Sequence, residues 1–345
     1  MSRARDVSIV IPTFNRPARL RLVLDALARQ SADPGSFEVV IVDDGSDVPI
    51  AETLSTASFP FELRWVRQDN AGPARARNRG IEEARAPLVL FLDDDVEPLP
   101  ALVEQHLKSH AAEASAAVIM GPLSSLPHYS QPWVAWEQAK VEQQYQAMIS
   151  GKMIPTFRQF WTGNASLARE HLIALGGFDT KYLRGEDVEL GARLHARGLV
   201  FRFNPHAAGL HHAERSLDSW CTAHSSYGRL EVDIFGHLGE AEMIEVLAGN
   251  LSRLHVGTRA VLRACFRRDE LFGVTAKAIR GFLQSRAATL AAGLADKSCS
   301  VLANVLYWRA SAEALGPERL GRLIRRADEL IRRGETVEFG SIPGS

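Results

Sequence analysis

Residues 88–95 run from five apolar side chains directly into three aspartates, Leu-Val-Leu-Phe-Leu-Asp-Asp-Asp. An unbroken apolar run of this length is typical of a strand that is buried on both faces of a parallel sheet. Asp93, Asp94 and Asp95 then stand where that strand leaves the core. Three adjacent carboxylates repel one another unless a cation or hydrogen-bond donors compensate. Oxygen ligands of this kind suit Mg²⁺ or Mn²⁺. An acidic surface turn is the alternative, so partners elsewhere in the chain decide between the two.

Two further segments have the same design. Residues 7–11 are apolar and lead into Pro-Thr-Phe-Asn-Arg-Pro, and residues 38–42 lead into Asp43-Asp44-Gly-Ser. Between them, apolar residues recur at helical spacing over 20–27. Strand, helix, strand is a parallel crossover unit, and open parallel sheets bind ligands beyond the carboxyl ends of their strands. All three polar clusters are therefore predicted to meet at one edge.

The first turn, residues 12–17, contains no glycine, so it lacks the dinucleotide fingerprint, and no Walker A lysine motif is present. A metal on the aspartates is then the simplest way to hold phosphates. Asp44 is positioned to accept a hydrogen bond from a ribose hydroxyl or a base N–H.

The segment Asn70–Gly80 reads Asn-Ala-Gly-Pro-Ala-Arg-Ala-Arg-Asn-Arg-Gly. Pro73 is typical of a first helical turn, and Arg75 and Asn78 share one face of that helix. A helix N-terminus with arginine suits an anionic group. A solvated basic helix is the alternative.

A third polar region runs from Trp161 through Gly-Asn-Ala-Ser to Gly-Gly-Phe-Asp and then Gly-Glu-Asp-Val-Glu-Leu, residues 185–190. Helical spacing begins at Glu186, so Glu186 and Asp187 fall in a first turn, where the helix dipole favours carboxylates. Such a carboxylate facing a pocket can act as a general base. Simple helix capping is the alternative.

This ordered series of motifs resembles the family 2 glycosyltransferases of the GT-A fold, over roughly residues 6–215. The resemblance implies a mostly parallel nucleotide-binding sheet flanked by helices, followed here by an all-helical C-terminal extension. It also implies a nucleotide-sugar donor, UDP-sugar by family frequency, with Mn²⁺ or Mg²⁺. Residues implied or expected to contact the donor are Pro12, Thr13, Asn15, Asp43, Asp44, Arg75, Asn78, Asp93 and Asp94.

The resemblance assigns the metal to Asp95 and Asp93, with Asp187 as catalytic base and Glu186 beside it. Histidines follow the strand-like residues 199–203, and we expect His211 or His212 to touch the metal or the diphosphate. Trp161, Gly163 and Asn164 are the candidates for contact with acceptor or donor sugar. No separate carboxylate nucleophile is evident, which favours single-displacement, inverting transfer.

The chain lacks the Gln-x-x-Arg-Trp motif associated with processive polysaccharide synthases of this family. No apolar run approaches the roughly 18 residues of a membrane helix. We therefore expect one sugar to be transferred per encounter, to a glycan, lipid-linked or small-molecule acceptor.

The composition is ordinary for a globular protein, with 46% hydrophobic and 23% charged residues among 345. Three cysteines without a CxxC pair argue against a disulfide scaffold or zinc site. A strand that begins by Val7 leaves no room for a signal peptide. These features predict a cytoplasmic protein without a nucleic-acid partner.

The charge is unevenly distributed. Residues 241–345 hold 16 Lys+Arg against 11 Asp+Glu, whereas residues 1–240 hold 24 against 30. Helices are expected over 241–254, 257–268, 272–294, 299–314 and 316–333. Within them, residues 251–290 mix eight basic side chains with apolar ones. We expect a helical lid or a homodimer interface with a solvated basic face, and peripheral contact with the inner face of a membrane is the alternative.

We expect a glycosyltransferase domain over 1–235, with a donor half of about 1–122 and an acceptor half of about 123–235, and a helical region over 236–345. Two other functions are open. A nucleotidyltransferase would need a triphosphate-gripping loop after the first strand, which residues 12–17 do not supply. A non-catalytic nucleotide-sugar-binding protein would not need the acid at residue 187.

Overall fold

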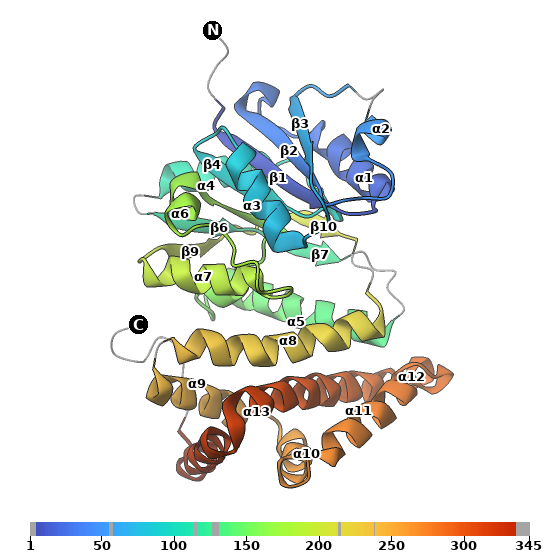
Figure 1. Ribbon diagram of the computed structural model, residues 1–345, viewed down its shortest axis with the longest axis vertical. Coiled ribbons are helices and arrows are strands. Elements are labelled where there is room, and N and C mark those ends of the chain that lie inside the picture. The colour runs from blue at the N-terminus through green and yellow to red at the C-terminus, as the bar shows by residue number, and fades with distance from the viewer. Residues whose placement is uncertain are drawn as a thin grey trace. The chain divides into compact units, whose positions relative to one another are not determined.

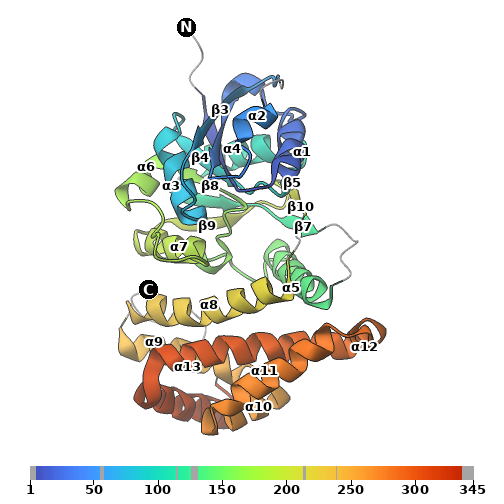
Figure 2. The same cartoon turned by 45° about the vertical axis from the view of Figure 1, so that its right-hand side comes forward.

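The computed structural model describes residues 5–54, 58–113, 116–125, 131–212, 215–237 and 239–335 (Figures 1 and 2). The chain divides into two compact units. Unit 1 comprises Met1–His128 and Gln138–Ala213, and unit 2 comprises Tyr129–Glu137 and Glu214–Ser345. The predicted boundary at residues 235/236 lies at the far end of a helix, Leu217–Gly236, that belongs wholly to unit 2. The division of unit 1 into donor and acceptor halves stays a prediction.

Unit 1 is built on a seven-stranded sheet with strand order β3-β2-β1-β4-β8-β6-β9. Its strands are β1 (Val7–Thr13), β2 (Phe37–Asp43), β3 (Glu62–Arg67), β4 (Leu88–Leu92), β6 (Ala117–Met120), β8 (Asn164–Ala168) and β9 (Val200–Phe203). The pairings are parallel except where β8 meets β4 and β6. The predicted mostly parallel sheet is confirmed. The antiparallel β8 was not foreseen, because Asn-Ala-Ser-Leu-Ala lacks the apolar composition of a buried strand.

A small second sheet has the order β5-β10-β7, with β5 (Val96–Pro98), β7 (Leu123–Ser125) and β10 (Gly209–His211). β10 pairs with β5 so that His211 lies opposite Val96. This pairing places His211 and His212 next to the residues that directly follow Asp95.

Helices cover both faces of the large sheet. They are α1 (Pro17–Leu27), α2 (Ile50–Leu54), α3 (Pro73–Glu83), α4 (Leu102–Ala112), α6 (Arg169–Ala174) and α7 (Glu186–Ala196), and two 3₁₀ turns lie at Pro34–Ser36 and Phe157–Gln159. Ile9 and Ile11 of β1 pack with Leu20 and Leu24 of α1. On the other face, Val10 lies so close to α3 that a Cβ at Gly80 would stand 2.2 Å from Val10 Cγ1. Burial on both faces explains the unbroken apolar runs.

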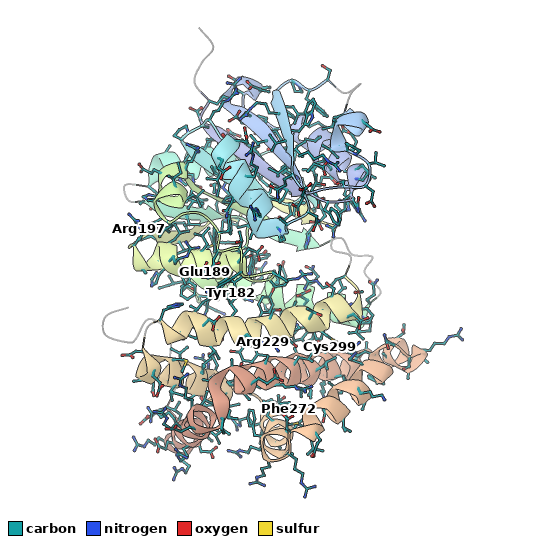
Figure 3. All side chains as sticks on the ribbon, in the orientation of Figure 1. Tyr182, Glu189, Arg197, Arg229, Phe272 and Cys299 are labelled. Carbon is teal, nitrogen blue, oxygen red and sulfur yellow. The ribbon has the colours of Figure 1, made fainter. Side chains whose placement is uncertain are left out.

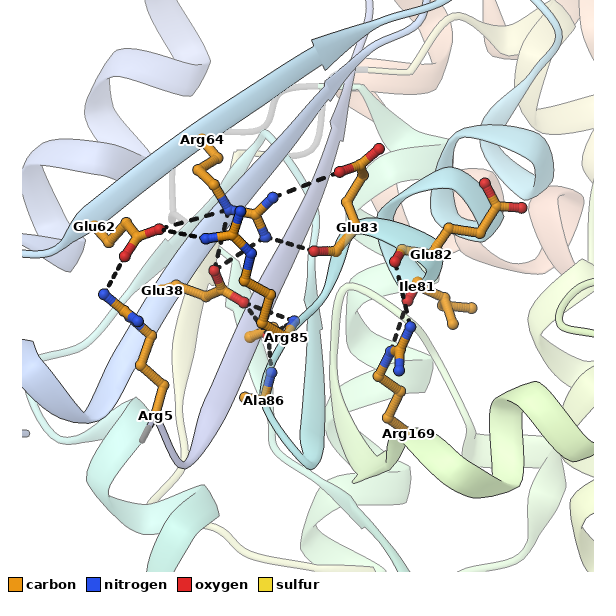
Figure 4. Close-up of polar contacts among 11 residues, drawn as sticks. Arg5, Glu38, Glu62, Arg64, Ile81, Glu82, Glu83, Arg85, Ala86 and Arg169 are labelled. Carbon is orange, nitrogen blue, oxygen red and sulfur yellow. Dashed lines mark hydrogen bonds and ion pairs between the residues drawn. The ribbon is translucent and has the colours of Figure 1, made fainter. Parts of the chain in front are cut away.

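A buried charge cluster lies at the amino end of β2, opposite to the edge where the polar motifs gather (Figure 4). Glu38 accepts hydrogen bonds from Ser8 Oγ at 2.6 Å, the Arg85 amide at 2.8 Å and Arg64 at 3.0 Å. Burial would raise the pKa of Glu38, but these donors outweigh it and hold the pKa below its ordinary value. The cluster joins β1, β2 and β3 and is structural.

Unit 2 is helical. α5 (Pro132–Ile149) contributes its first turns, and the remaining helices are α8 (Leu217–Gly236), α9 (Glu240–Ser252), α10 (Val256–Arg267), α11 (Glu270–Leu283), α12 (Arg286–Leu290) and α13 (Ala292–Arg333). α13 contacts both α8 and α11, and it lies between them in both views (Figures 1 and 2). Within the described residues, no helix is both long enough and apolar enough to cross a bilayer.

The predicted C-terminal helices are confirmed, with differences in where they break. The expected helix 272–294 is split twice: Ser285 adopts an extended conformation (φ −86°, ψ 158°) between α11 and α12, and Ala291 (φ −120°, ψ 57°) separates α12 from α13. The expected helices 299–314 and 316–333 are both present but form one element, α13, which bends at Gly316 (φ 73°, ψ 167°) before Pro317.

Candidate active site

The carboxyl ends of β1, β2 and β4 lie side by side. Thr13 pairs with Asp43 in the strand register, and Val10 pairs with Phe91 two residues before Asp93. Thr13 Oγ1 donates a hydrogen bond to Asp94 Oδ2 at 2.7 Å. The polar clusters that were predicted to converge from separate strands therefore do so.

Arg16 forms ion pairs with two of the three consecutive aspartates. Its NH1 lies 2.8 Å from Asp95 Oδ2 and 3.2 Å from Asp94 Oδ1. Asp94 is buried, and burial together with the charges of Asp95 and Asp93 raises its pKa to about 6, against the opposing effects of Thr13 and Arg16. Arg16 compensates only part of the negative charge of the three aspartates, so the cluster can attract a further cation.

The two adjacent histidines have different surroundings. His211 Nε2 lies 3.6 Å from Asp95 Oδ1. His212 Nδ1 is 2.8 Å from Arg19 NH1, and its Nε2 is 3.2 Å from Glu97 Oε2. Both ring nitrogens of His212 are thus used within the protein, with Nδ1 as the acceptor. His211 is the histidine that the structure brings to the aspartates.

Arg77 connects the aspartate run to α7. Its NH2 donates to Asp93 Oδ1 at 2.7 Å, and its NH1 donates to Glu186 Oε1 at 2.8 Å. The arginine is buried, and its guanidinium lies over the Phe178 ring at 5.9 Å. Burial would lower the pKa of Arg77, but Asp93 and Glu186 outweigh it and raise the pKa above its ordinary value. The cation is therefore permanent.

Asp187 stands in the first turn of α7, as predicted. The helix begins after Gly185, which adopts a left-handed conformation (φ 78°) that glycine accommodates without strain. Burial and the adjacent Glu186 raise the pKa of Asp187 to about 7, against the opposing effect of Arg77. Figure 3 labels three residues of this region: Tyr182 in the loop before α7, Glu189 within α7, and Arg197 directly after it. A carboxylate with a pKa near 7 is suited to accept a proton at neutral pH.

Asp43 shapes the loop after β2. Its Oδ1 accepts from the Ser46 amide at 2.9 Å, and its Oδ2 accepts from Arg67 at 2.9 Å. Burial would raise the pKa of Asp43, but these donors and the Ile50 amide keep it below its ordinary value. We expected Asp43 to contact the donor. In the structure, its carboxylate holds the loop after β2 through these hydrogen bonds.

Asp44 is also buried, at the rim of the same loop. Its Oδ1 accepts from Gln68 at 2.7 Å and from the Ala71 amide at 3.0 Å, while its Oδ2 accepts from the Gly72 amide at 2.9 Å. These bonds fix the turn that leads into α3. A carboxylate oxygen can accept two hydrogen bonds, so Oδ2 retains capacity for one more.

Asn15 joins the first two loops. It has a positive φ of 56°, which asparagine tolerates better than most residues. Its amide oxygen accepts from the Asp47 backbone at 2.8 Å, and its backbone N–H donates to Ser46 Oγ at 2.9 Å. Pro12 is half-buried at the end of β1, and Phe14, which we did not single out from the sequence, is 45% exposed beside it.

Arg75 and Asn78, which we expected to share a ligand-binding face of α3, have different surroundings. Arg75 is exposed in the first turn of α3. Asn78 instead bonds the backbone of Phe178 in both directions, at 2.7 Å to its N–H and 2.8 Å to its carbonyl. The amide group therefore holds the Gly-Gly-Phe-Asp turn against α3.

Gly163 lies next to the aspartates, whereas Asn164 is an internal residue. A Cβ at Gly163 would stand 3.1 Å from Asp93 Oδ2, and Trp161 is half-buried and forms a T-shaped ring pair with Tyr145 at 5.9 Å. The Asn164 side chain is buried among His106 Nε2 at 2.8 Å and two backbone carbonyls. Its amide positions the turn from within.

Sequence reasoning missed the two residues that organise this site, Arg77 and His106. Arg77 lies on the stripe Ala74, Arg77, Ile81, whose other members are buried, so the helical period could have marked it as a buried charge. His106 lies on the buried side of α4 with Leu102 and Val103, and burial lowers its pKa to about 4. Its partners come from β8, which no local pattern indicates.

Within the described residues, no three or more carboxylate, imidazole or thiol side chains are placed to enclose a metal ion. Asp95 and His211 nevertheless present an oxygen and a nitrogen 3.6 Å apart, a separation at which both can reach one ion at about 2.0–2.1 Å from each. Mg²⁺ is commonly held by one or two carboxylates together with substrate phosphates rather than by an all-protein cage. The residues present therefore fit a metal that shares its ligands with a diphosphate.

Residues 8–172 match the family model described as "Glycosyl transferase family 2". The chain is 35% identical over 231 residues to validoxylamine A glucosyltransferase of Streptomyces hygroscopicus subsp. limoneus, covering 59% of this chain and 51% of that protein. It is 29% identical over 231 residues to pre-mycofactocin glycosyltransferase of Mycobacterium tuberculosis, covering 65% of this chain and 46% of that protein. The chain thus spans about half the length of these curated relatives.

Two solved structures are similar over almost the whole chain. One is S. aureus TarS 1–349 in complex with UDP-GlcNAc, with a TM-score of 0.53, 17% identity and coverage of 99% of this chain and 95% of that one. The other is the mannosyltransferase PcManGT from Pyrobaculum calidifontis in complex with GDP-Man and Mn²⁺, with a TM-score of 0.52, 17% identity and coverage of 96% and 88%. At this identity the likeness shows the fold, which is the predicted GT-A fold.

Proposed function

Residues 8–172 of this chain match the glycosyl transferase family 2 model, and from that match we propose that the protein transfers a sugar from a nucleotide-sugar to an acceptor hydroxyl. The observation that carries the proposal is the convergence of the aspartate run and the Asp187 carboxylate, which Arg77 links through Asp93 and Glu186. One part of this site suits a diphosphate, and the other suits proton abstraction.

The nucleoside would occupy the rim formed by the loops after β1 and β2. Phe14 offers an exposed ring face on which a base can stack. Asp44 offers the remaining acceptor capacity of Oδ2 to a ribose hydroxyl or a base N–H. A UDP-sugar is the proposed donor class. The UDP-GlcNAc complex of TarS supports it, and the GDP-Man complex of PcManGT makes GDP the alternative to test.

The diphosphate would lie against the aspartate run. Asp95 and His211 would hold Mn²⁺ or Mg²⁺ there, and the bound ion would supply Lewis-acid stabilisation of the leaving diphosphate. Arg16 is half-exposed and bonds both Asp94 and Asp95, so it can turn toward phosphate oxygens without leaving the cluster. His212, with both ring nitrogens engaged by Arg19 and Glu97, is left out of the proposed metal set.

Asp187 would take the proton of the acceptor hydroxyl as that oxygen attacks the anomeric carbon. The bond between that carbon and the diphosphate oxygen breaks in the same step, and the diphosphate leaves with the bonding electron pair. A single displacement inverts the anomeric centre. Glu186 accepts a hydrogen bond from Arg77, so we assign it the role of anchoring the first turn of α7 rather than that of a second base. The glycosyltransferase names of the relatives favour this reaction over nucleotidyl transfer.

A donor screen by thermal shift tests the proposal. Wild type, Asp95→Ala and a control variant are heated with UDP-, GDP- or dTDP-sugars in Mn²⁺, Mg²⁺ or EDTA. The control is Asp25→Ala, at a partly exposed aspartate of α1 that pairs with Arg21. We expect one nucleotide class to stabilise wild type and Asp25→Ala in the presence of metal, by about 2.7 kcal/mol at 100-fold excess over Kd. Asp95→Ala should lose this stabilisation. An absence of response to every nucleotide would refute donor binding.

A further inference from the structure

The sequence of unit 2 contains a basic, partly apolar stretch that the proposed reaction does not use. Several of its large aliphatic side chains are strongly exposed: Val256 is 65%, Val274 63%, Leu290 88% and Leu294 56% exposed. They lie on α10, α11, α12 and the first turn of α13, within 39 consecutive residues.

Four cations accompany these side chains. Arg267, Arg268, Lys277 and Arg286 are exposed and have no acidic partner among the described residues. Other arginines of the stretch are neutralised, since Arg263 pairs with Asp328 and Arg280 pairs with Asp218. Residues 251–290 contain eight basic and two acidic side chains. The surface thus keeps an excess of positive charge.

On α11, the helical geometry puts both kinds of side chain on one exposed face. On α11, Phe272 and Leu283 are buried, and Phe272 is labelled in Figure 3. Val274, Lys277, Ala278 and Gly281 are exposed and follow the i, i+3, i+4, i+7 spacing of one helical face. Because α11 packs on α13, this face is directed away from the helical core of unit 2.

We propose that the exposed sides of α10–α12 and the first turn of α13, defined by these four aliphatic and four basic residues, dock on an anionic phospholipid bilayer. Aliphatic side chains enter the acyl boundary while the cations pair with anionic headgroups. A second copy of the chain fits less well, since a symmetric contact would press two like-charged surfaces together. A single-stranded nucleic acid fits less well too, since it favours aromatic stacking platforms, whereas Phe272 is buried and Phe266 packs against it.

The experiment is sedimentation of the full chain with vesicles of phosphatidylcholine alone or of phosphatidylcholine mixed with phosphatidylglycerol. We expect binding to the anionic vesicles only, and weakening as salt shortens the Debye length from ~10 Å to ~3 Å. The double variant Lys277→Gln/Arg286→Gln should lower partitioning by about 25-fold, at about five-fold per charge. Leu290→Ser/Leu294→Ser should weaken binding while leaving its salt dependence unchanged.

The matched control is Arg325→Gln/Arg332→Gln, two exposed arginines of the C-terminal half of α13, which should bind as wild type does. Circular dichroism confirms that each variant is folded. The proposal is overturned if anionic vesicles do not bind the protein, or if the substitutions at Lys277, Arg286, Leu290 and Leu294 have no more effect than the control. It is also overturned if light scattering shows a dimer that these substitutions dissociate, or if RNA binds in place of vesicles. Vesicle binding involves no sugar transfer, so its failure would leave the proposed reaction untouched.

Discussion

Arg77 donates from NH2 to Asp93 Oδ1 at 2.7 Å and from NH1 to Glu186 Oε1 at 2.8 Å. One buried guanidinium thus joins the end of β4 to the beginning of α7, elements that are almost a hundred residues apart in the sequence. The proposed donor site and the proposed base cannot shift independently of each other while this link holds. Precise placement of reacting groups is a large part of catalysis.

Arg77→Met should lower the free energy of unfolding by about 3–5 kcal/mol, because it leaves Glu186 buried without its partner. Denaturant unfolding measures the change. The double variant Arg77→Met/Glu186→Gln removes both buried charges and should regain part of that stability while transfer stays impaired. If the double variant recovered both stability and activity, Arg77 would have no positioning role.

The rate should depend on pH through Asp187. Burial and Glu186 raise the pKa of this carboxyl to about 7, and only its ionised form can accept a proton. We therefore expect kcat to rise as the pH increases through about 7 and to level off above it. Asp94, with a pKa of about 6, is the competing group. If the midpoint of the rise in kcat is the same in Asp94→Asn as in wild type, the rise reports Asp187. If the midpoint moves in this variant, the rise reports Asp94.

The Gly-Gly-Phe-Asp turn offers a matched pair of substitutions. Gly176 and Gly177 both have a φ of 72°, but a Cβ at Gly176 meets nothing within 4 Å, whereas one at Gly177 would stand 2.3 Å from Asn78 Oδ1. Gly176→Ala should cost about 1 kcal/mol for the left-handed backbone alone. Gly177→Ala should cost more, since it also displaces Asn78 from the Phe178 backbone. Equal losses in thermal unfolding would contradict the assigned role of Asn78.

The sequence contained enough information to predict the sheet edge, because apolar runs and their polar ends are local patterns. Thr13, Asp44, Asp93 and Asp187 lie at the predicted strand and helix ends. The partners of buried polar groups were not predictable in this way. Asn78 and Asn164 looked like ligand-binding amides, yet each is used by backbone groups brought in from distant segments.

The same limit applies to charges. Arg75 and Arg77 are two residues apart in one basic helix, and the helical period separates the exposed one from the buried one. The buried partners of Arg77 come from distant segments and were not predictable. Most of the C-terminal helices were predictable to within a few residues, since each has its own amphipathic period, but α13 begins at Ala292 rather than at residue 299. The break at Ser285 depends on how α11 and α12 pack on α13 and was not predictable.

The measurement that tests the central proposal most directly is release of nucleoside diphosphate from the donor identified by thermal shift, for wild type and Asp187→Asn. The substitution keeps size and shape but removes the basic oxygen, and a general base contributes about 10²–10⁴-fold. We predict that Asp187→Asn binds the donor with unchanged affinity and releases diphosphate at least about 100-fold more slowly. Release at the wild-type rate by the folded variant would contradict the assignment of Asp187 as the base.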